Sequence, residues 1–412
     1  MSGPAPHDPY RALREPGFRR YLSGNIIGTL GSQMQGVAVG WELYERTHSP
    51  LILGLVGLVQ VIPIILLFLP VGHLVDQYDR RRVLIGAQVG VATIALGLAV
   101  VSGLNGPVSL IFVLLFLGGT MRALIQPAKS AFLPEIVALP AFQSAVAWNS
   151  GGWQVATVVG PALGGAILGA THHAKWVYLT HAVLALGFAL LVLGVPTARQ
   201  SRPAMVASLD SLLDGARYVS KSKVLLAAIT LDLFAVLFGG AVALLPVYAK
   251  DILHVGPAGL GWLLAAEAIG AVGMTITLAH LPPLQKAGPA LLRAVAVFGL
   301  AMIGFGLSRV FLLSMAMLIV AGAADSVSVV IRMTLAQLGT PDHLRGRVSA
   351  VNSLFIGTSN QLGEFESGAL AAAAGPVASV VLGGIGTLIV VGLVTLRWPE
   401  IRRMGRLEEV RM

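Results

Sequence analysis

The chain has 412 residues, of which 56% are hydrophobic and 11% are charged, and its mean hydropathy is +0.81. Soluble domains carry roughly 25% charged residues, so this composition excludes a water-soluble globular protein. The net charge of +9 does not indicate a nucleic-acid-binding protein, because the basic residues lie in short loops between apolar segments. The absence of cysteine from the sequence excludes disulfides and thiol-based metal sites.

Along the chain, twelve apolar segments are long enough to cross about 30 Å of hydrocarbon. They are predicted to be helices, because a backbone in lipid must satisfy its own hydrogen bonds. The predicted spans are 20–44, 51–75, 83–103, 107–127, 144–170, 176–195, 224–249, 258–281, 290–308, 311–338, 348–374 and 377–397. Lys and Arg are concentrated on the side that holds the chain ends, so both termini are predicted to be cytoplasmic.

The polar stretch 196–223 divides the chain into an N-terminal half, 1–195, and a C-terminal half, 224–412, which ends in a basic tail. Short motifs recur in the two halves at one constant offset. Pro50, Leu53 and Gly54 recur as Pro257, Leu260 and Gly261, and Pro134-Glu135 recurs as Pro341-Asp342, since 257 − 50 and 341 − 134 are both 207. The repeat predicts an all-α membrane protein of two pseudo-symmetric six-helix bundles, with a substrate site between the halves.

The loop after the second span carries a candidate gating motif of Gly72, Asp76, Asp79, Arg80 and Arg81. The glycine permits close helix approach, and Asp76 is expected to cap the following turn and to pair with cations of a neighbouring helix. The motif resembles the loop signature Gly-x-x-x-Asp-Arg-x-Gly-Arg-Arg of the major facilitator superfamily, although two of its positions differ. A basic loop that only sets the topology is the alternative interpretation.

The fifth span contains a second motif, formed by Gly160, Pro161, Gly164 and Gly165. Gly160 and Gly164 form a stripe of small residues with Gly152 and Ala156, which is expected to pack closely against a partner helix. The run resembles the Gly-Pro-x-x-Gly-Gly motif of exporters and antiporters in the same superfamily. This resemblance implies export rather than import, and plain helix packing is the alternative.

Other residues narrow the resemblance to one branch of the superfamily. They are Leu13, Phe18, Arg19, Tyr21, Leu22, Trp41, Tyr44, Thr47, Ser49, Leu53, Gly54, Asp76, Asp79, Arg80, Arg81 and the run from Thr340 to Arg347. From about residue 10 to 397 the chain is similar to the enterobactin exporter-like, or transmembrane secretion effector, branch. The resemblance implies a bacterial transporter and leaves the substrate open.

Charged residues inside predicted spans are candidates for proton coupling, because such residues usually face a cavity or a partner. They are Glu42, Arg122, Asp232, Glu267, Asp325, Arg332 and Glu364. By the resemblance, spans 1, 4, 7 and 10 line the cavity, and all of these residues except Glu267 and Glu364 would border it. Asp325 and Arg332 share one helix face at a separation of roughly 10 Å, so they are expected either to switch a proton or to act as static partners.

Uncharged polar residues in the spans are candidates for substrate contact, namely Asn25, Gln33, Gln60 and Gln361. An interhelical hydrogen bond explains each of them equally simply. Histidines lie mostly at span edges, and a surface position is the favoured interpretation for them. No cluster with metal-ligand spacing and no phosphate-binding glycine loop is found, so no metal, cofactor or ATP hydrolysis is expected.

Together these patterns predict a secondary transporter of the bacterial inner membrane, not an enzyme. The expected activity is proton-coupled export of a small amphipathic compound, such as a siderophore, drug or metabolite, by alternating access. A monomer in the lipid bilayer without a nucleic-acid partner is expected. A lipid or lysolipid flippase-type permease is one alternative, and a non-transporting receptor or assembly factor is another.

Overall fold

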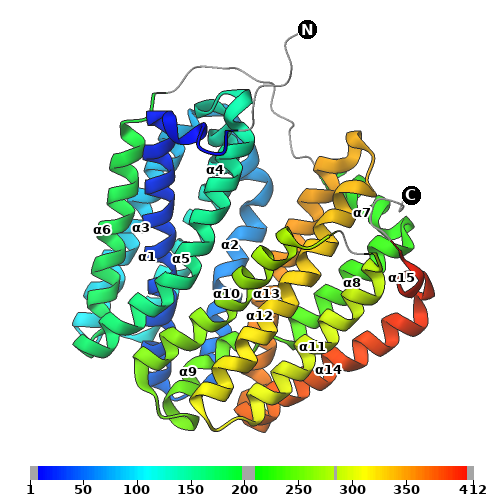
Figure 1. Cartoon of the computed structure of the whole chain (residues 1–412). Helices are drawn as coiled ribbons and strands as arrows, with labels where there is room; N and C mark the ends of the chain where they lie inside the picture. Colours follow the sequence, from blue (N-terminus) through cyan, green and yellow to red (C-terminus); the bar gives the residue numbers. More distant parts are fainter. Residues whose placement is uncertain (1–7, 197–208, 283–284, 406–412) are drawn as a thin grey trace. The chain divides into compact units, whose positions relative to one another are not determined.

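The computed structural model describes residues 8–196, 209–282 and 285–405, and the regular elements in these ranges are helical (Figure 1). The first half of the chain contains α1 (Pro16–Thr47), α2 (Pro50–Gln77), α3 (Arg80–Gly103), α4 (Val108–Ile136), α5 (Phe142–Thr171) and α6 (Ala174–Leu193). The second half contains α8 (Lys223–Phe238), α10 (Gly256–His280), α11 (Ala287–Leu307), α12 (Phe311–Leu338), α13 (Asp342–Ala374) and α14 (Pro376–Arg397). The shorter elements are η1 (Ala12–Arg14), η2 (Leu139–Ala141), α7 (Leu209–Lys221), η3 (Ala241–Leu244), α9 (Leu245–Val247), η4 (Tyr248–Ile252) and α15 (Pro399–Arg403).

Ten helical stretches in the described ranges are long and apolar enough to cross a membrane, and α8 to η4 count as one of them. The remaining long helices, α1 and α13, have 32 and 33 residues. Both carry polar and charged side chains, among them Glu42 and Glu364, which makes them less apolar than the other ten. Ten stretches and these two helices give the twelve helices that the sequence predicts, so the all-α fold is confirmed.

Some predicted boundaries were wrong. The fourth span continues to Ile136 with Pro127 and Pro134 inside the helix, so Lys129, expected in a loop, lies within α4. The seventh span is broken after Phe238, where a Cβ on Gly240 would lie 2.4 Å from the carbonyl oxygen of Gly363 in α13. The break therefore lets the backbone of α13 approach at a point where no side chain fits.

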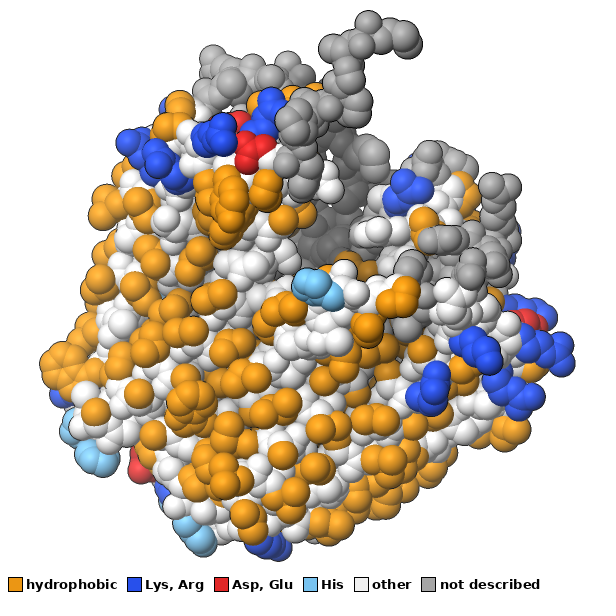
Figure 2. Space-filling model, in the orientation of Figure 1, with side chains coloured by type: hydrophobic (Ala, Val, Ile, Leu, Met, Phe, Trp, Pro, Cys, Tyr) orange, Lys and Arg blue, Asp and Glu red, His pale blue; other side chains and the backbone are white. Residues whose placement is uncertain are grey.

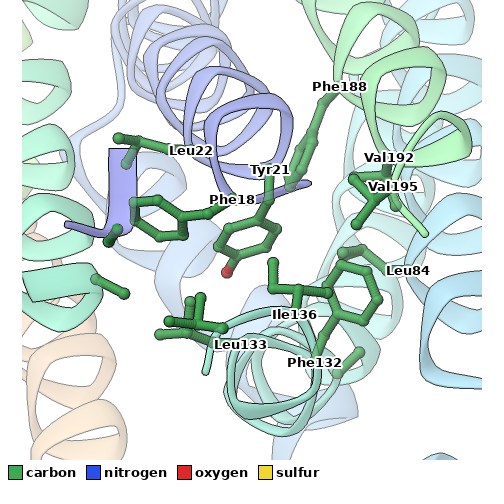
Figure 3. Close-up of a cluster of buried hydrophobic side chains, with 14 of the residues drawn as sticks. Phe18, Tyr21, Leu22, Leu84, Phe132, Leu133, Ile136, Phe188, Val192 and Val195 are labelled. Carbon is green, nitrogen blue, oxygen red and sulfur yellow. The ribbon is translucent and has the colours of Figure 1, made fainter. Parts of the chain in front are cut away.

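The chain forms two compact units, which are described separately. Unit 1 comprises Met1–Ala38 and Ile62–Val206. Its core surrounds Tyr21 of α1, whose ring packs edge-on against Phe132 of α4 and Phe188 of α6, with centroid distances of 5.8 and 6.3 Å (Figure 3). The ammonium group of Lys129 lies 5.3 Å from the centroid of Phe188, and this cation–π contact accounts for a lysine inside a span.

Unit 2 comprises Val39–Val61 and Ala207–Met412. Its core lies between α8, α11, α12 and α14 and is closed by Ile401 of α15. Part of the predicted linker is helical, since α7 docks on the start of α13 through an ion pair of 2.8 Å between Arg347 and Asp214. The hydroxyl of Tyr218 also donates to the carbonyl of Gly339, at 2.5 Å.

Apolar side chains cover the flanks of the helices on the face drawn in Figure 2, while Lys and Arg gather near helix ends. This is the distribution expected where lipid tails contact the flanks and headgroups contact the ends.

Candidate functional site

A buried ion pair joins two helices of unit 2. The guanidinium of Arg332 in α12 lies 2.5 Å from the carboxylate of Asp232 in α8, and only 5% and 7% of the two side chains is exposed. Arg332 also donates from Nε to the hydroxyl of Ser328, at 3.3 Å. The sequence had suggested Asp325, on the same helix, as the partner of this arginine. The structure instead gives Arg332 an acid from a different helix, because α8 and α12 pack against each other.

Asp325 lies within electrostatic range of this pair, and Glu267 lies within range of Asp325. Glu267 of α10 and Asp325 of α12 interact electrostatically with each other, and Asp325 also interacts with Asp232 and Arg332. Glycine makes this proximity possible, because a Cβ on Gly322 would lie 2.0 Å from the carbonyl oxygen of Glu267. The structure thus brings four predicted residues together in unit 2, three acids and one arginine.

The contact between α2 and α13 is polar and closely packed. A Cβ on Gly57 would lie 2.5 Å from Oε2 of Glu364 and 2.8 Å from Oε1 of Gln361, so both side chains lie over this glycine. Oε1 of Gln361 is buried and makes no hydrogen bond with the described residues. One turn away, Gly54 and Gly368 bring the two backbones into contact. Gln60 lies on α2 with its side chain partly exposed.

In unit 1 the small-residue stripe of α5 packs against α1. A Cβ on Gly160 would lie 2.6 Å from Cβ of Gln33, and one on Gly164 would lie 2.8 Å from Cα of Met34. Pro161 and Gly165 are buried in the same helix, which stays continuous through the proline. The stripe therefore has a packing role, whatever its role in export.

Asn25 makes an interhelical hydrogen bond. Its Nδ2 donates to Oδ1 of Asn149 in α5 at 2.8 Å, while its own Oδ1 is buried without a hydrogen-bond partner among the described residues. Asn25 was a candidate either for substrate contact or for an interhelical hydrogen bond, and the structure contains the hydrogen bond.

His181 of α6 is a buried polar residue, whereas the sequence favours a surface position for the histidines in general. Its Nδ1 lies 2.7 Å from Oε1 of Gln35 in α1, and 3% of the residue is exposed. Arg122 of α4 has an exposed side chain and interacts electrostatically with His181. The contact joins a histidine of the sixth span to a glutamine of the first, and a single sequence does not show which residues of two separate spans meet.

The gating motif divides between two helices. Because α2 continues to Gln77, Asp76, which was expected to cap the following turn, lies in the last turn of α2. The cap is Asp79, whose carboxylate accepts from the amides of Arg81 and Arg82 at 2.9 and 3.3 Å. The surroundings of Gly72 and of the Asp76 side chain lie outside what the structure describes.

The arginines of this motif hold neighbouring helices. Arg80 forms an ion pair with Glu135 at the end of α4. Arg81 donates from Nε to the carbonyl of Val192 in α6, at 3.1 Å. Glu135 belongs to the Pro134-Glu135 motif, which recurs 207 residues later. The ion pair with Arg80 therefore joins the gating motif to this repeated motif.

The end of α1 forms a further polar cluster in unit 2. Glu42 pairs with Arg46 at 2.6 Å and does not reach a second helix through this contact. Tyr44 donates a hydrogen bond to the carboxylate of Asp251 in η4, and the ammonium group of Lys250 lies 5.8 Å from the ring centroid of Trp41. Tyr44 and Asp251 are themselves 207 residues apart, so they occupy equivalent places in the two repeats.

Comparison with known proteins identifies the family. A family model described as transmembrane secretion effector matches residues 7–408. Enterobactin exporter EntS of Citrobacter koseri is 28% identical over 391 residues, which cover 94% of this chain and 93% of that protein, and EntS of Shigella boydii serotype 4 matches equally.

Solved transporters share the fold. A bacterial homologue of the human lysosomal transporter Spinster, inward-facing and unoccupied, matches with a TM-score of 0.73 at 15% identity, over 94% of this chain and 98% of that one. The inward-open xylose transporter XylE of E. coli matches with a TM-score of 0.67 at 15% identity, over 92% and 94% of the two chains. The chain therefore belongs to the transmembrane secretion effector family of the major facilitator superfamily, and it is a multi-pass membrane transporter of a small-molecule substrate, not an enzyme.

Proposed function

We propose that the chain is a proton-coupled exporter of a small amphipathic compound of the siderophore class, or of a related drug or metabolite. The similarity to proteins named enterobactin exporters supports the class of cargo. The motif around Gly160 and Pro161 supports the direction of transport by its resemblance to that of exporters and antiporters. Arg122, with its exposed side chain in α4, suits an anionic or zwitterionic cargo.

The observation that carries the coupling proposal is the buried Asp232–Arg332 pair with Asp325 beside it. Asp325 holds the proton while Arg332 is engaged by Asp232. When Arg332 turns toward Asp325, the approaching positive charge favours release of that proton. The two residues are two turns apart on α12, so a change of side-chain rotamer, or a small helix movement, connects the two arrangements.

Glu267 has a secondary place in this scheme. It lies on α10 against the backbone of α12, within electrostatic reach of Asp325. A negative charge there opposes a second negative charge on Asp325, so Glu267 would set the balance between the two proton states.

The proposed location is the bacterial inner membrane, with both termini in the cytoplasm and the protein acting as a monomer. The placement of Lys and Arg in the loops supports this orientation. Alternating access then moves the cargo between the two sides by rocking the repeats around a central site.

The test is transport in proteoliposomes with an imposed pH gradient and a panel of siderophores, drugs and lysolipids. The proposal expects gradient-driven movement of a siderophore or drug and none of the lysolipids. Movement of every substrate at the same rate with and without the gradient would reject proton coupling.

A further inference from the structure

The segment that follows α14, including α15, packs against the core of unit 2. After α14 the chain turns and lays Ile401 and Met404 into the core, where 0% and 6% of these residues is exposed. The amides of Ala287 and Gly288, in the first turn of α11, donate to the carbonyls of Gly405 and Met404 at 3.0 and 3.3 Å. The returning chain thus satisfies helix-terminal amides that would otherwise lack a partner.

Close contact fixes the position of this segment. A Cβ on Gly288 would lie 1.7 Å from the carbonyl oxygen of Ile401, so the backbone of α15 rests directly on α11. The backbone between the two buried anchors, Ile401 and Met404, is consequently held in place. The residues between the anchors are Arg402 and Arg403, and both are exposed.

More positive charge surrounds the two arginines. Arg397, at the end of α14, is exposed with its guanidinium 5.6 Å from the ring centroid of Trp398. The one carboxylate of α15, Glu400, lies 3.0 Å from the ammonium group of Lys223. Its pKa is lowered, first by a hydrogen bond from its own backbone and then by Lys223, so it stays charged and paired. The acid is therefore largely neutralised by the lysine, and a positive surface remains.

One exposed face of α14 is apolar and ends next to these arginines. The side chains of α14 at spacings of three and four residues are exposed along one face, and Leu396, the last of them, is 82% exposed. They are Ile385, Ile389, Leu393 and Leu396. A membrane helix exposes such a face to acyl chains, and aromatic and basic residues at its end lie at the level of the headgroups. Trp398 and Arg397 follow Leu396 in this order.

We propose that Arg397, Arg402 and Arg403 form a binding site for the phosphate of one anionic phospholipid, whose acyl chains lie along the exposed face of α14. The three guanidinium groups supply the charge complementarity, because arginine donates several hydrogen bonds to a phosphate in fixed geometry. A zwitterionic lipid carries its own cation beside the phosphate, so the site prefers a lipid with net negative charge. The pinned backbone of α15 lowers the entropy lost on binding.

The binding experiment uses the delipidated full chain in detergent with phosphatidylglycerol, phosphatidylcholine and inorganic phosphate as separate probes, and native mass spectrometry as the readout. Wild type is expected to retain phosphatidylglycerol in preference to phosphatidylcholine. Each basic residue at a membrane surface contributes about fivefold in affinity, so Arg402→Gln/Arg403→Gln should lose roughly 25-fold. Arg402→Lys/Arg403→Lys keeps the charge and should recover most of that loss.

The matched control is Arg19→Gln/Arg82→Gln, which removes the same charge from two exposed arginines of unit 1. It should keep the affinity of the α15 site. Equal loss in the control and in the α15 variant would overturn the proposal in favour of general attraction to net charge. Retention of phosphatidylglycerol by the glutamine variant would also overturn it, as would displacement of the lipid by equimolar inorganic phosphate, which would identify a free-anion site. Gel filtration and thermal unfolding in phosphatidylcholine check that each variant is folded.

Discussion

Replacing Asp232 by asparagine removes the carboxylate that is paired with the buried Arg332 guanidinium, while Asp325 stays within electrostatic range of it. The two charged groups are 2.5 Å apart and their side chains are almost fully shielded. Removing one partner of such a pair costs roughly 3–5 kcal/mol, because the remaining charge stays desolvated. With an unfolding entropy of roughly 2 cal/mol/K per residue, this corresponds to a fall of about 4–6 °C in Tm for a chain of this length.

The assay is thermal unfolding of purified Asp232→Asn, Arg332→Met and the double variant Asp232→Leu/Arg332→Met in one detergent. Each single variant should lower Tm, while the double variant should recover most of the loss, because neither charge is then buried. The control is Lys223→Gln, which breaks the exposed pair with Glu400 and should leave Tm unchanged. Unaltered Tm in the single variants, or a double variant whose losses simply add, would refute the reasoning.

Further predictions concern local geometry. Gly288→Ala should lower Tm by several degrees, because its Cβ would lie 1.7 Å from a backbone oxygen, whereas Gly273→Ala, with nothing within 4 Å, should not; thermal unfolding of both checks this. His172→Gly should raise stability by up to about 1 kcal/mol in the same assay, since this helix cap has φ +56°; a lower Tm would count against it. Cysteines at Tyr44 and Asp251 of this naturally cysteine-free chain, joined by a short reagent that forms a disulfide with each thiol, should stop transport until the disulfides are reduced, if the hydrogen-bonded ends separate in each cycle; full transport by the cross-linked protein would show that they do not.

The long helices were predictable from the sequence because the membrane imposes a single rule on the backbone. An apolar run that crosses lipid must be helical, so patterning located even α1 and α13 despite their polar residues. The ends were less predictable. The fourth span was predicted to end at 127, but α4 continues through Pro127 and Pro134 to Ile136, with Pro134 in its last turn. The break at Gly239 and Gly240 depends on the approach of α13, which local sequence does not encode.

The polar residues of the spans were predictable as a set, but their partners were not. Arg332 had a candidate acid on its own helix, and only the packing of α8 on α12 gives it Asp232. His181 lies just inside the sixth predicted span, and its contact with Gln35 of α1 could not be predicted from the sequence. Asp79, rather than a residue of α2, is the N-cap of α3, because α2 continues to Gln77. The contacts of Arg332 and His181 join residues far apart in the chain, whereas the Asp79 cap is local.

Coupling of transport to Asp325 is tested most directly by comparing two assays on Asp325→Asn in proteoliposomes. The first measures accumulation of a labelled siderophore driven by a pH gradient, and the second measures counterflow exchange without a gradient. The account predicts that wild type performs both and that the variant keeps counterflow but loses gradient-driven accumulation. Gradient-driven accumulation by Asp325→Asn at the wild-type rate would contradict it.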